Sequence, residues 1–291
     1  MDIRLQDTQD YAGGNTRFNK RRRVVVALSG VISIAMAPAT LLAQTAKAAK
    51  VAAEAKPLAA VNFSGRQRSL AIRAARCYAQ LGLGVLPPRS AEVMKIAATE
   101  FESSLTRLKV FCAGKRSAKL LEDQAALWTP YSNALREAPA PEAAAPLNEM
   151  LERLIPVCSA THDQIILEVG TPLATEVSRS GRQRFLSQRA SQLFMFREWR
   201  VTRGDYKDID ALTVESRQLR ANLRVSTELL IDAKREIDLA ETQWIFFDEA
   251  LRAQLNGRAD EISRSNVAKT SERLLEIFDR MTQNIVNKNE A

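Results

Sequence analysis

The sequence predicts an all-α protein, and three observations support this fold class. Leu, Ala, Glu and Arg are abundant, whereas the 291 residues include only 11 Gly and 10 Pro, a composition that favours helix over sheet. Apolar residues recur at three- and four-residue steps, and no alternating apolar run of the strand type stands out. One eleven-residue stretch also occurs twice, as SGRQRSLAIRA from Ser64 and as SGRQRFLSQRA from Ser180.

The repeat extends well beyond these eleven residues. Trp128 matches Trp244 at the same spacing as the two motifs. Further on, residues 152–154 and 272–274 both spell Glu-Arg-Leu, if the second copy contains four additional residues. A match of this length indicates two copies of one folding unit rather than a shared local motif.

Within each unit the apolar spacing predicts four helices joined by short turns, the plan of an antiparallel four-helix bundle. We assign residues 61–170 to the first unit and residues 171–291 to the second. Each first helix has apolar residues on the face away from its own core, Ile72 in one and Met195 and Trp199 in the other. Such a face would be exposed unless covered, so we expect the two units to pack through their first helices.

Residues 1–43 have the parts of an export signal. The basic run NKRRR precedes Val24–Ala43, which is twenty residues without a charge and is followed by small residues. Arg21 and Arg22, followed by any one residue and then by two apolar residues, fit the twin-arginine pattern. We therefore predict an exported, periplasmic protein.

Two fates of this segment are open. Cleavage near Ala43 would leave residues 44–60 as an Ala-rich spacer before the first unit. Alternatively, residues 24–43 are long enough to remain as an anchor in the cytoplasmic membrane. In both cases the body of the protein faces the periplasm.

The composition argues against several functional classes. The formal charge of +8 is partly in the N-terminal tail and too diffuse elsewhere to indicate nucleic-acid binding. A single histidine, His162, and three scattered cysteines do not make a zinc site or a Cys/His protease. We expect no enzyme activity, metal or cofactor. Cys77, Cys112 and Cys158 are interpreted as small core residues, and the sequence leaves any disulfide among them open.

The SGRQR motif allows two interpretations. Ser64 with Gln67, and Ser180 with Gln183, have the spacing of a helix capping box. Capping does not explain the arginines, because a first helical turn favours acidic residues. Residues 55–91 contain five Arg, one Lys and no acidic residue. Uncompensated arginines are typical of a solvated face or of an anion site.

Helical geometry separates the arginines of the motif. Arg66 and its counterpart Arg182 lie near the core-side stripe of the first helix, at 100° per residue. Arg68 and Arg184 point to the opposite face, which we expect to meet the other unit. Arg66 and Arg182 should therefore affect stability more than ligand affinity.

The second copy of the motif resembles the AGRQRMLSQR signature of the PilJ-type domain. This domain is the N-terminal sensor region of type IV pili methyl-accepting chemotaxis transducers, and it is related to the sensor of NarX-like nitrate/nitrite kinases. The second copy matches through Gln188 and Arg189, whereas the first departs at Ser69, Ala71 and Ile72. The resemblance covers essentially the whole exported chain as two tandem units.

The resemblance implies an anion site. In the NarX-like relatives an arginine from each first helix holds nitrate at a two-fold axis, and Arg68 and Arg184 match that position. Gly65 and Gly181 would allow close approach of the helices. The secondary arginines of the motif are Arg66, Arg182, Arg73 and Arg189.

The function implied is that of an exported sensory protein binding a small anion, such as nitrate or nitrite, between its two units. No kinase or methyl-accepting coiled coil follows the second unit, so we expect a membrane receptor or kinase as signalling partner. The alternative is a structural or interaction protein of the envelope, whose arginines serve the interface between the units.

Replacing Arg21 and Arg22 with Lys should trap the precursor inside the cell, because the twin-arginine route recognises the arginine pair rather than its charge. Cell fractionation with immunoblotting measures this, and replacing Arg4 and Arg17 with Lys is the control. Unchanged export of the Arg21/Arg22 variant would favour the general secretory route.

Overall fold

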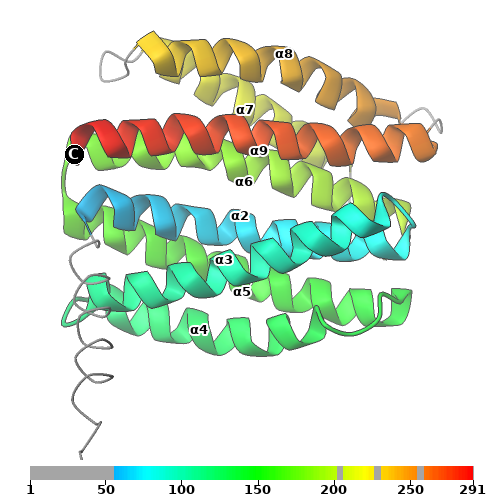
Figure 1. Cartoon of the computed structure of the whole chain (residues 1–291), viewed down its shortest axis with the longest axis horizontal. Helices are drawn as coiled ribbons and strands as arrows, with labels where there is room; N and C mark the ends of the chain where they lie inside the picture. The colour runs from blue at the N-terminus through cyan, green and yellow to red at the C-terminus, as the bar shows by residue number, and fades with distance from the viewer. Residues whose placement is uncertain (1–55, 202–205, 226–230, 254–258, 291) are drawn as a thin grey trace, which may run out of the picture. The chain divides into compact units, whose positions relative to one another are not determined.

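The computed structural model describes residues 56–201, 206–225, 231–253 and 259–290, all within one unit, Gln44–Ala291. These residues form eight helices and no strand, which confirms the all-α prediction (Figure 1). None of the described helices is both long enough and apolar enough to cross a membrane. The predicted export signal lies outside the described residues. The helices are α2 (Pro57–Gly82), α3 (Pro87–Cys112), α4 (Ser117–Ala134), α5 (Pro141–Val169), α6 (Pro172–Glu198), α7 (Tyr206–Val225), α8 (Ile231–Ala253) and α9 (Glu261–Asn289).

Both motif-bearing helices begin well before the SGRQR motif. α2 starts at Pro57 and α6 at Pro172, where the fixed φ of proline and its missing N–H suit the first helical position. The N-cap of α6 is Thr171, whose side chain accepts a hydrogen bond from the first turn. Ser64 and Ser180 therefore lie inside their helices, and the capping-box interpretation was wrong.

The first turn of α2 is capped by the far end of the chain. Residues 57–60, expected to belong to the spacer, are already helical, and Lys56 provides no side-chain cap. Instead the Glu290 carboxylate accepts hydrogen bonds from the backbone N–H groups of Leu58 (2.6 Å) and Ala59 (3.1 Å). Glu290 thus satisfies two backbone N–H groups that have no partner within α2. Its negative charge also interacts favourably with the positive end of the helix dipole.

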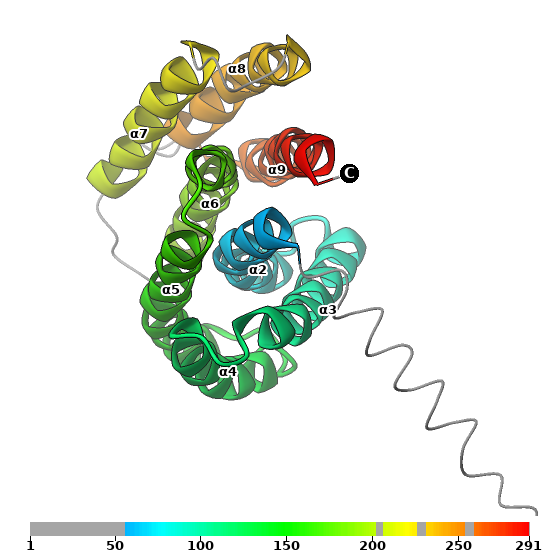
Figure 2. The ribbon, with the colours of Figure 1, turned by 90° about the vertical axis from the view of Figure 1, so that its left-hand side faces the viewer.

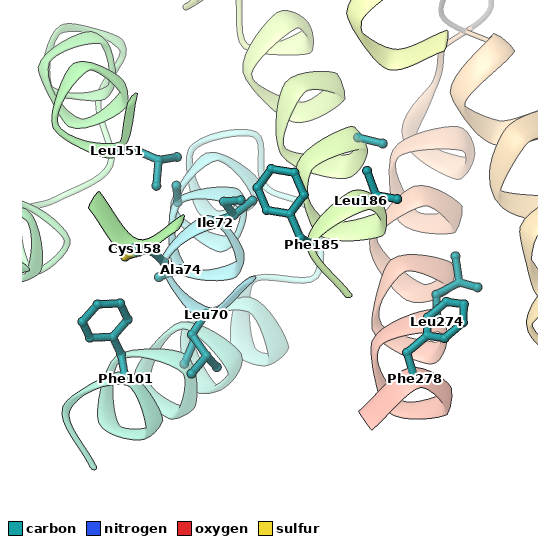
Figure 3. Close-up of a cluster of buried hydrophobic side chains, with 14 of the residues drawn as sticks. Leu70, Ile72, Ala74, Phe101, Leu151, Cys158, Phe185, Leu186, Leu274 and Phe278 are labelled. Atoms are coloured by element: carbon teal, nitrogen blue, oxygen red, sulfur yellow. The ribbon is translucent and has the colours of Figure 1, made fainter. Parts of the chain in front are cut away.

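The helix α2 is surrounded by helices of both repeats. It contacts α3, α5, α6 and α9, and Figure 2 shows these helices around it. α6 in turn contacts α2, α5, α7 and α9. Ile72 and Met195, predicted on the outer face of each first helix, are fully buried. Figure 3 shows Ile72 of α2 and Phe185 of α6 pointing toward one another within one buried apolar cluster.

The transition between the repeats is short. α5 ends at Val169, and Gly170 follows with φ +64°, a left-handed conformation that favours glycine. Only Gly170 and Thr171 separate α5 from α6. This is the place where the sequence predicted the boundary between the two units.

The C-terminal ends of α2 and α6 approach closely at one glycine. A Cβ added at Gly82 would lie 2.0 Å from Cζ2 of Trp199, the C-cap of α6. The Trp199 ring also lies 5.9 Å, between centroids, from the Tyr78 ring of α2. The indole thus occupies the volume that any larger residue at position 82 would need.

We predict that Gly82→Ala lowers the free energy of unfolding by about 1–3 kcal/mol, because the methyl group overpacks the contact with Trp199. Chemical denaturation measures the effect in wild type and in a Trp199→Ala background, where the methyl group should cost nothing. Gly84→Ala, at φ +68° with no atom near, should cost the same in both backgrounds. An equal cost of Gly82→Ala in both backgrounds would contradict the close contact.

Candidate functional site

Arg66 and Arg182, which have no acidic neighbours in the motif, have acidic partners on other helices. Arg66 donates from Nη2 to Glu100 of α3 and to Asp279 of α9, both at 3.1 Å. Arg182 holds Glu215 of α7 with two hydrogen bonds, Nε to Oε1 at 2.8 Å and Nη2 to Oε2 at 3.2 Å. Both arginine side chains are partly exposed, 24% and 32%, so neither is a core residue.

A reciprocal set of ion pairs joins the two repeats. Arg73 and Arg76 of α2 both bind Glu272 of α9. In the other direction, Arg189 of α6 holds Glu152 of α5 with contacts of 2.7 and 3.0 Å. Glu152 and Glu272 are the glutamates of the duplicated Glu-Arg-Leu segment. Each first helix therefore donates to the last helix of the other repeat.

The carboxylates on α9 are ionised because arginines surround them. Burial by itself raises the pKa of Glu272, but the charges and hydrogen bonds of Arg76 and Arg73 outweigh it and lower the pKa to about 2. The pKa of Asp279 is also lowered: burial opposes this, and the charge of Arg184 is the largest favourable cause. Both carboxylates are thus fixed anions at neutral pH.

Arg68 and Arg184 occupy equivalent positions but have different partners. Arg184 is 1% exposed, and its Nη1 donates to Asp279 at 2.6 Å. Arg68 is 5% exposed, and its Nη1 donates to the Ser159 hydroxyl at 3.3 Å. Its guanidinium carbon lies 5.4 Å from the centroid of the Phe185 ring. Within the described residues no ion pair reaches Arg68.

The repeat alignment explains this difference. Continuing without a gap from the Glu-Arg-Leu segments places Ser159 opposite Asp279. The second repeat therefore has a carboxylate where the first has a hydroxyl. The Nε of Arg68 has no hydrogen-bond partner among the described residues, and Nη2 of Arg184 also lacks one. Of these two arginines, only Arg68 combines an unpaired donor with a missing counter-charge.

Arg68 is a buried cation in a positive environment. Burial lowers the pKa of its guanidinium to about 10, and the charge of Arg182 acts in the same direction. Asp163 opposes the shift, but its side chain is exposed and makes no hydrogen bond to Arg68. At neutral pH Arg68 remains charged, so its burial without a carboxylate is unfavourable unless an anion is nearby.

The two motif glycines make room for side chains. A Cβ at Gly65 would lie 3.1 Å from Cε1 of His162 on α5. A Cβ at Gly181 would lie 2.6 Å from Nη2 of Arg184. Gly65 thus permits close packing of α2 on α5, and Gly181 leaves space for the buried guanidinium of its own helix.

The single histidine links three helices. His162 is 1% exposed, and its Nδ1 lies 2.8 Å from the Ser64 hydroxyl of α2. Its Nε2 lies 2.9 Å from the Ser178 hydroxyl of α6. Burial lowers the pKa of His162 well below its ordinary value, with a further contribution from Arg68. The second repeat has a similar contact, 2.7 Å between the Ser180 and Thr282 hydroxyls.

The three cysteines are buried and unpaired, in agreement with a core role. Burial raises the pKa of Cys158 to about 12, so its thiol stays protonated and unreactive at neutral pH. In the part of the chain that the structure describes, no group of His, Cys, Asp and Glu side chains could hold a metal ion.

Comparison with protein-family models, curated proteins and solved structures gave no match. The resemblance of the motif to PilJ-type domains therefore stays a prediction. The sequence identified the arginines of the motif as candidate site residues, but it did not reveal their partners Asp279 and Glu272 or the role of Ser159. Extending the ungapped alignment from the Glu-Arg-Leu segment would have shown the aspartate opposite a serine.

We predict that Glu272→Gln destabilises the protein at pH 7 by on the order of 2–3 kcal/mol, and that the difference shrinks on acidification. A carboxyl whose pKa is lower in the folded than in the unfolded state stabilises the fold above its ordinary pKa of 4.5. For Glu272 this contribution disappears as the pH falls toward 2.

Denaturant unfolding of wild type and Glu272→Gln between pH 7 and pH 3 measures this difference. Glu92→Gln is the control, because Glu92 pairs with Arg89 at an exposed site and should contribute little at any pH. A difference between wild type and Glu272→Gln that does not change with pH would contradict the ion-pair explanation.

Proposed function

We propose that this protein is a non-catalytic, all-helical binding protein that holds one small oxyanion, such as nitrate or nitrite, at Arg68 between its two repeats. One observation carries the proposal. Arg68 is 5% exposed without a carboxylate partner, whereas its counterpart Arg184 is paired with Asp279 at 2.6 Å. The anion would supply the negative charge that Ser159 lacks.

An internal carboxylate in the second repeat supports a small oxyanion as the ligand. The Asp279 carboxylate bridges two arginines, Arg184 through Oδ1 at 2.6 Å and Arg66 through Oδ2 at 3.1 Å. Nitrate and nitrite are planar oxyanions that can accept hydrogen bonds in a similar way. At the corresponding positions around Ser159 the arginines are Arg68 and Arg182. Burial is the largest cause that lowers the pKa of Arg68, and the nearby charge of Arg182 lowers it further.

This proposal modifies the clamp expected from the sequence. Arg184 already binds an internal carboxylate, so we assign the anion to Arg68 and a structural role to Arg184. The role of Arg182 changes too, since it would take part in the site while remaining bound to Glu215. Gly65 and Gly181 would support the site through packing.

We further propose that α2–α5 and α6–α9 are two four-helix bundles of the PilJ type. In support, α2, α3, α4 and α5 contact one another in a ring, and α6, α7, α8 and α9 repeat this pattern. The motif resemblance also favours an exported, periplasmic protein, or one held at the membrane by residues 24–43. In either case a membrane receptor or kinase would sense the bound state.

A second function is favoured by a different observation. Arg73 pairs with Glu272 and Arg189 with Glu152, so the same motif holds the repeats together. The protein would then be a structural or interaction protein of the envelope, and Arg68 would be one more interface residue. Anion binding separates these two functions.

We predict that Ser159→Asp abolishes anion binding and raises the melting temperature without ligand, because the new carboxylate neutralises Arg68 as Asp279 neutralises Arg184. Arg68→Ala should weaken binding on the order of ten- to a hundredfold, the loss of a charge-assisted hydrogen bond. A thermal-shift screen of nitrate, nitrite, sulfate and phosphate, followed by calorimetric titration, measures both effects.

Arg89→Ala is the matched control: Arg89 is an exposed arginine paired with Glu92, and its replacement should leave the anion affinity unchanged. If Ser159→Asp binds the anion like wild type, the site is not at Arg68. If none of the four anions raises the melting temperature of wild type, the interface function is favoured instead.

A further inference from the structure

One aromatic ring contacts both arginines of the proposed anion site. The guanidinium carbon of Arg68 lies 5.4 Å from the centroid of the Phe185 ring, and that of Arg182 lies 4.4 Å from the same centroid. Phe185 belongs to α6 and is 8% exposed. An aromatic face attracts cations, but it has no net charge and no hydrogen-bonding group. The ring therefore keeps water away from the two guanidinium groups without neutralising them.

This aromatic residue is not part of the architecture that the two repeats share. The counterpart of Phe185 is Ser69, which is 2% exposed and whose hydroxyl has no partner among the described residues. Phe185 and Ile72 point toward one another (Figure 3). The counterpart of Ile72 is Gln188, which donates to a backbone carbonyl at 2.9 Å. An apolar pair thus includes the ring beside Arg68, whereas the equivalent positions of the two repeats have a polar pair.

Of the two arginines that contact the ring, only one lacks a counter-charge. Arg182 is paired with Glu215 by two hydrogen bonds. Arg68 has no ion pair within the described residues, and the exposed carboxylate of Asp163 acts on it only at a distance. A monovalent anion would balance the charge of Arg68. A divalent anion would leave a negative charge in excess, close to Asp163.

We propose that Phe185 makes the site selective for weakly hydrated monovalent anions, so that charge and hydration, rather than an oxyanion shape alone, define the class of ligand. This inference rests on the proposed anion site at Arg68. On the side of the ring a bound anion gains no hydrogen bond, so the water that it loses there is not replaced. The loss is small for nitrate or thiocyanate, whereas it is large for formate and larger for strongly hydrated sulfate.

The test is calorimetric titration of the purified full chain with the sodium salts of nitrate, thiocyanate, formate and sulfate, in a buffer without chloride. Nitrate and formate are both planar and monovalent, so comparing them isolates hydration from charge. We expect wild type to bind nitrate and thiocyanate with similar affinity, and to bind formate and sulfate about tenfold or more weakly than nitrate.

Three variants examine the role of the ring. Phe185→Ser introduces the residue of the first repeat, and it should reduce the nitrate preference over formate and sulfate by about tenfold. Ile72→Gln changes the other member of the apolar pair to its counterpart, and it should reduce the preference in the same direction even if Phe185→Ser does not fold. Phe185→Leu keeps an apolar wall without a ring, so it should retain the order of affinities.

Phe194→Leu is the matched control, because Phe194 is fully buried on the same helix and its replacement should leave the ratio of affinities unchanged. If wild type binds formate or sulfate as tightly as nitrate, and Arg68→Ala weakens the binding of all of them, the anion site stands and the selectivity is overturned. A wild-type ratio in folded Phe185→Ser would also overturn it. If wild type binds none of the four anions, both the site and its selectivity are wrong.

Discussion

Burying arginines between two helices imposes a strict requirement for counter-charge, and the arrangement of this protein follows from how that requirement is met. A guanidinium removed from water is costly unless an anion and hydrogen bonds replace the solvent. Glu272 receives Arg73 and Arg76, and Asp279 receives Arg66 and Arg184. All four contacts join α9 to α2 or α6, so the carboxylates of the last helix fix where the first helix can lie.

Duplication provides an internal reference for judging each polar residue. Where both repeats use the same solution, as in the Arg73–Glu272 and Arg189–Glu152 pairs, the contact is part of the shared architecture. Where the two repeats have different residues at equivalent positions, the comparison shows which residue the packing of the helices does not require. Arg68 lacks the carboxylate that its counterpart has, and it is the residue from which we infer ligand binding.

The fold class could be predicted from the sequence because helical periodicity is a local property, and the short connection at Gly170 was visible for the same reason. The capping box failed because Ser64 fits the pattern equally well inside a helix that begins at Pro57. The acidic partners of the arginines could not be predicted from the sequence. Arg73 and Glu272 are 199 positions apart, and only the packing of α9 against α2 brings them together.

The capping of α2 by Glu290 has a consequence for the order of events during synthesis. The amide of Leu58 leaves the ribosome 232 residues before the carboxylate that satisfies it. Until then the first helix has an open N-terminus, and Arg73 and Arg76 lack their partner Glu272, however well the first repeat has collapsed. Native packing of the first helix therefore waits for synthesis of the last helix, and chains arrested before α9 would present this face to chaperones.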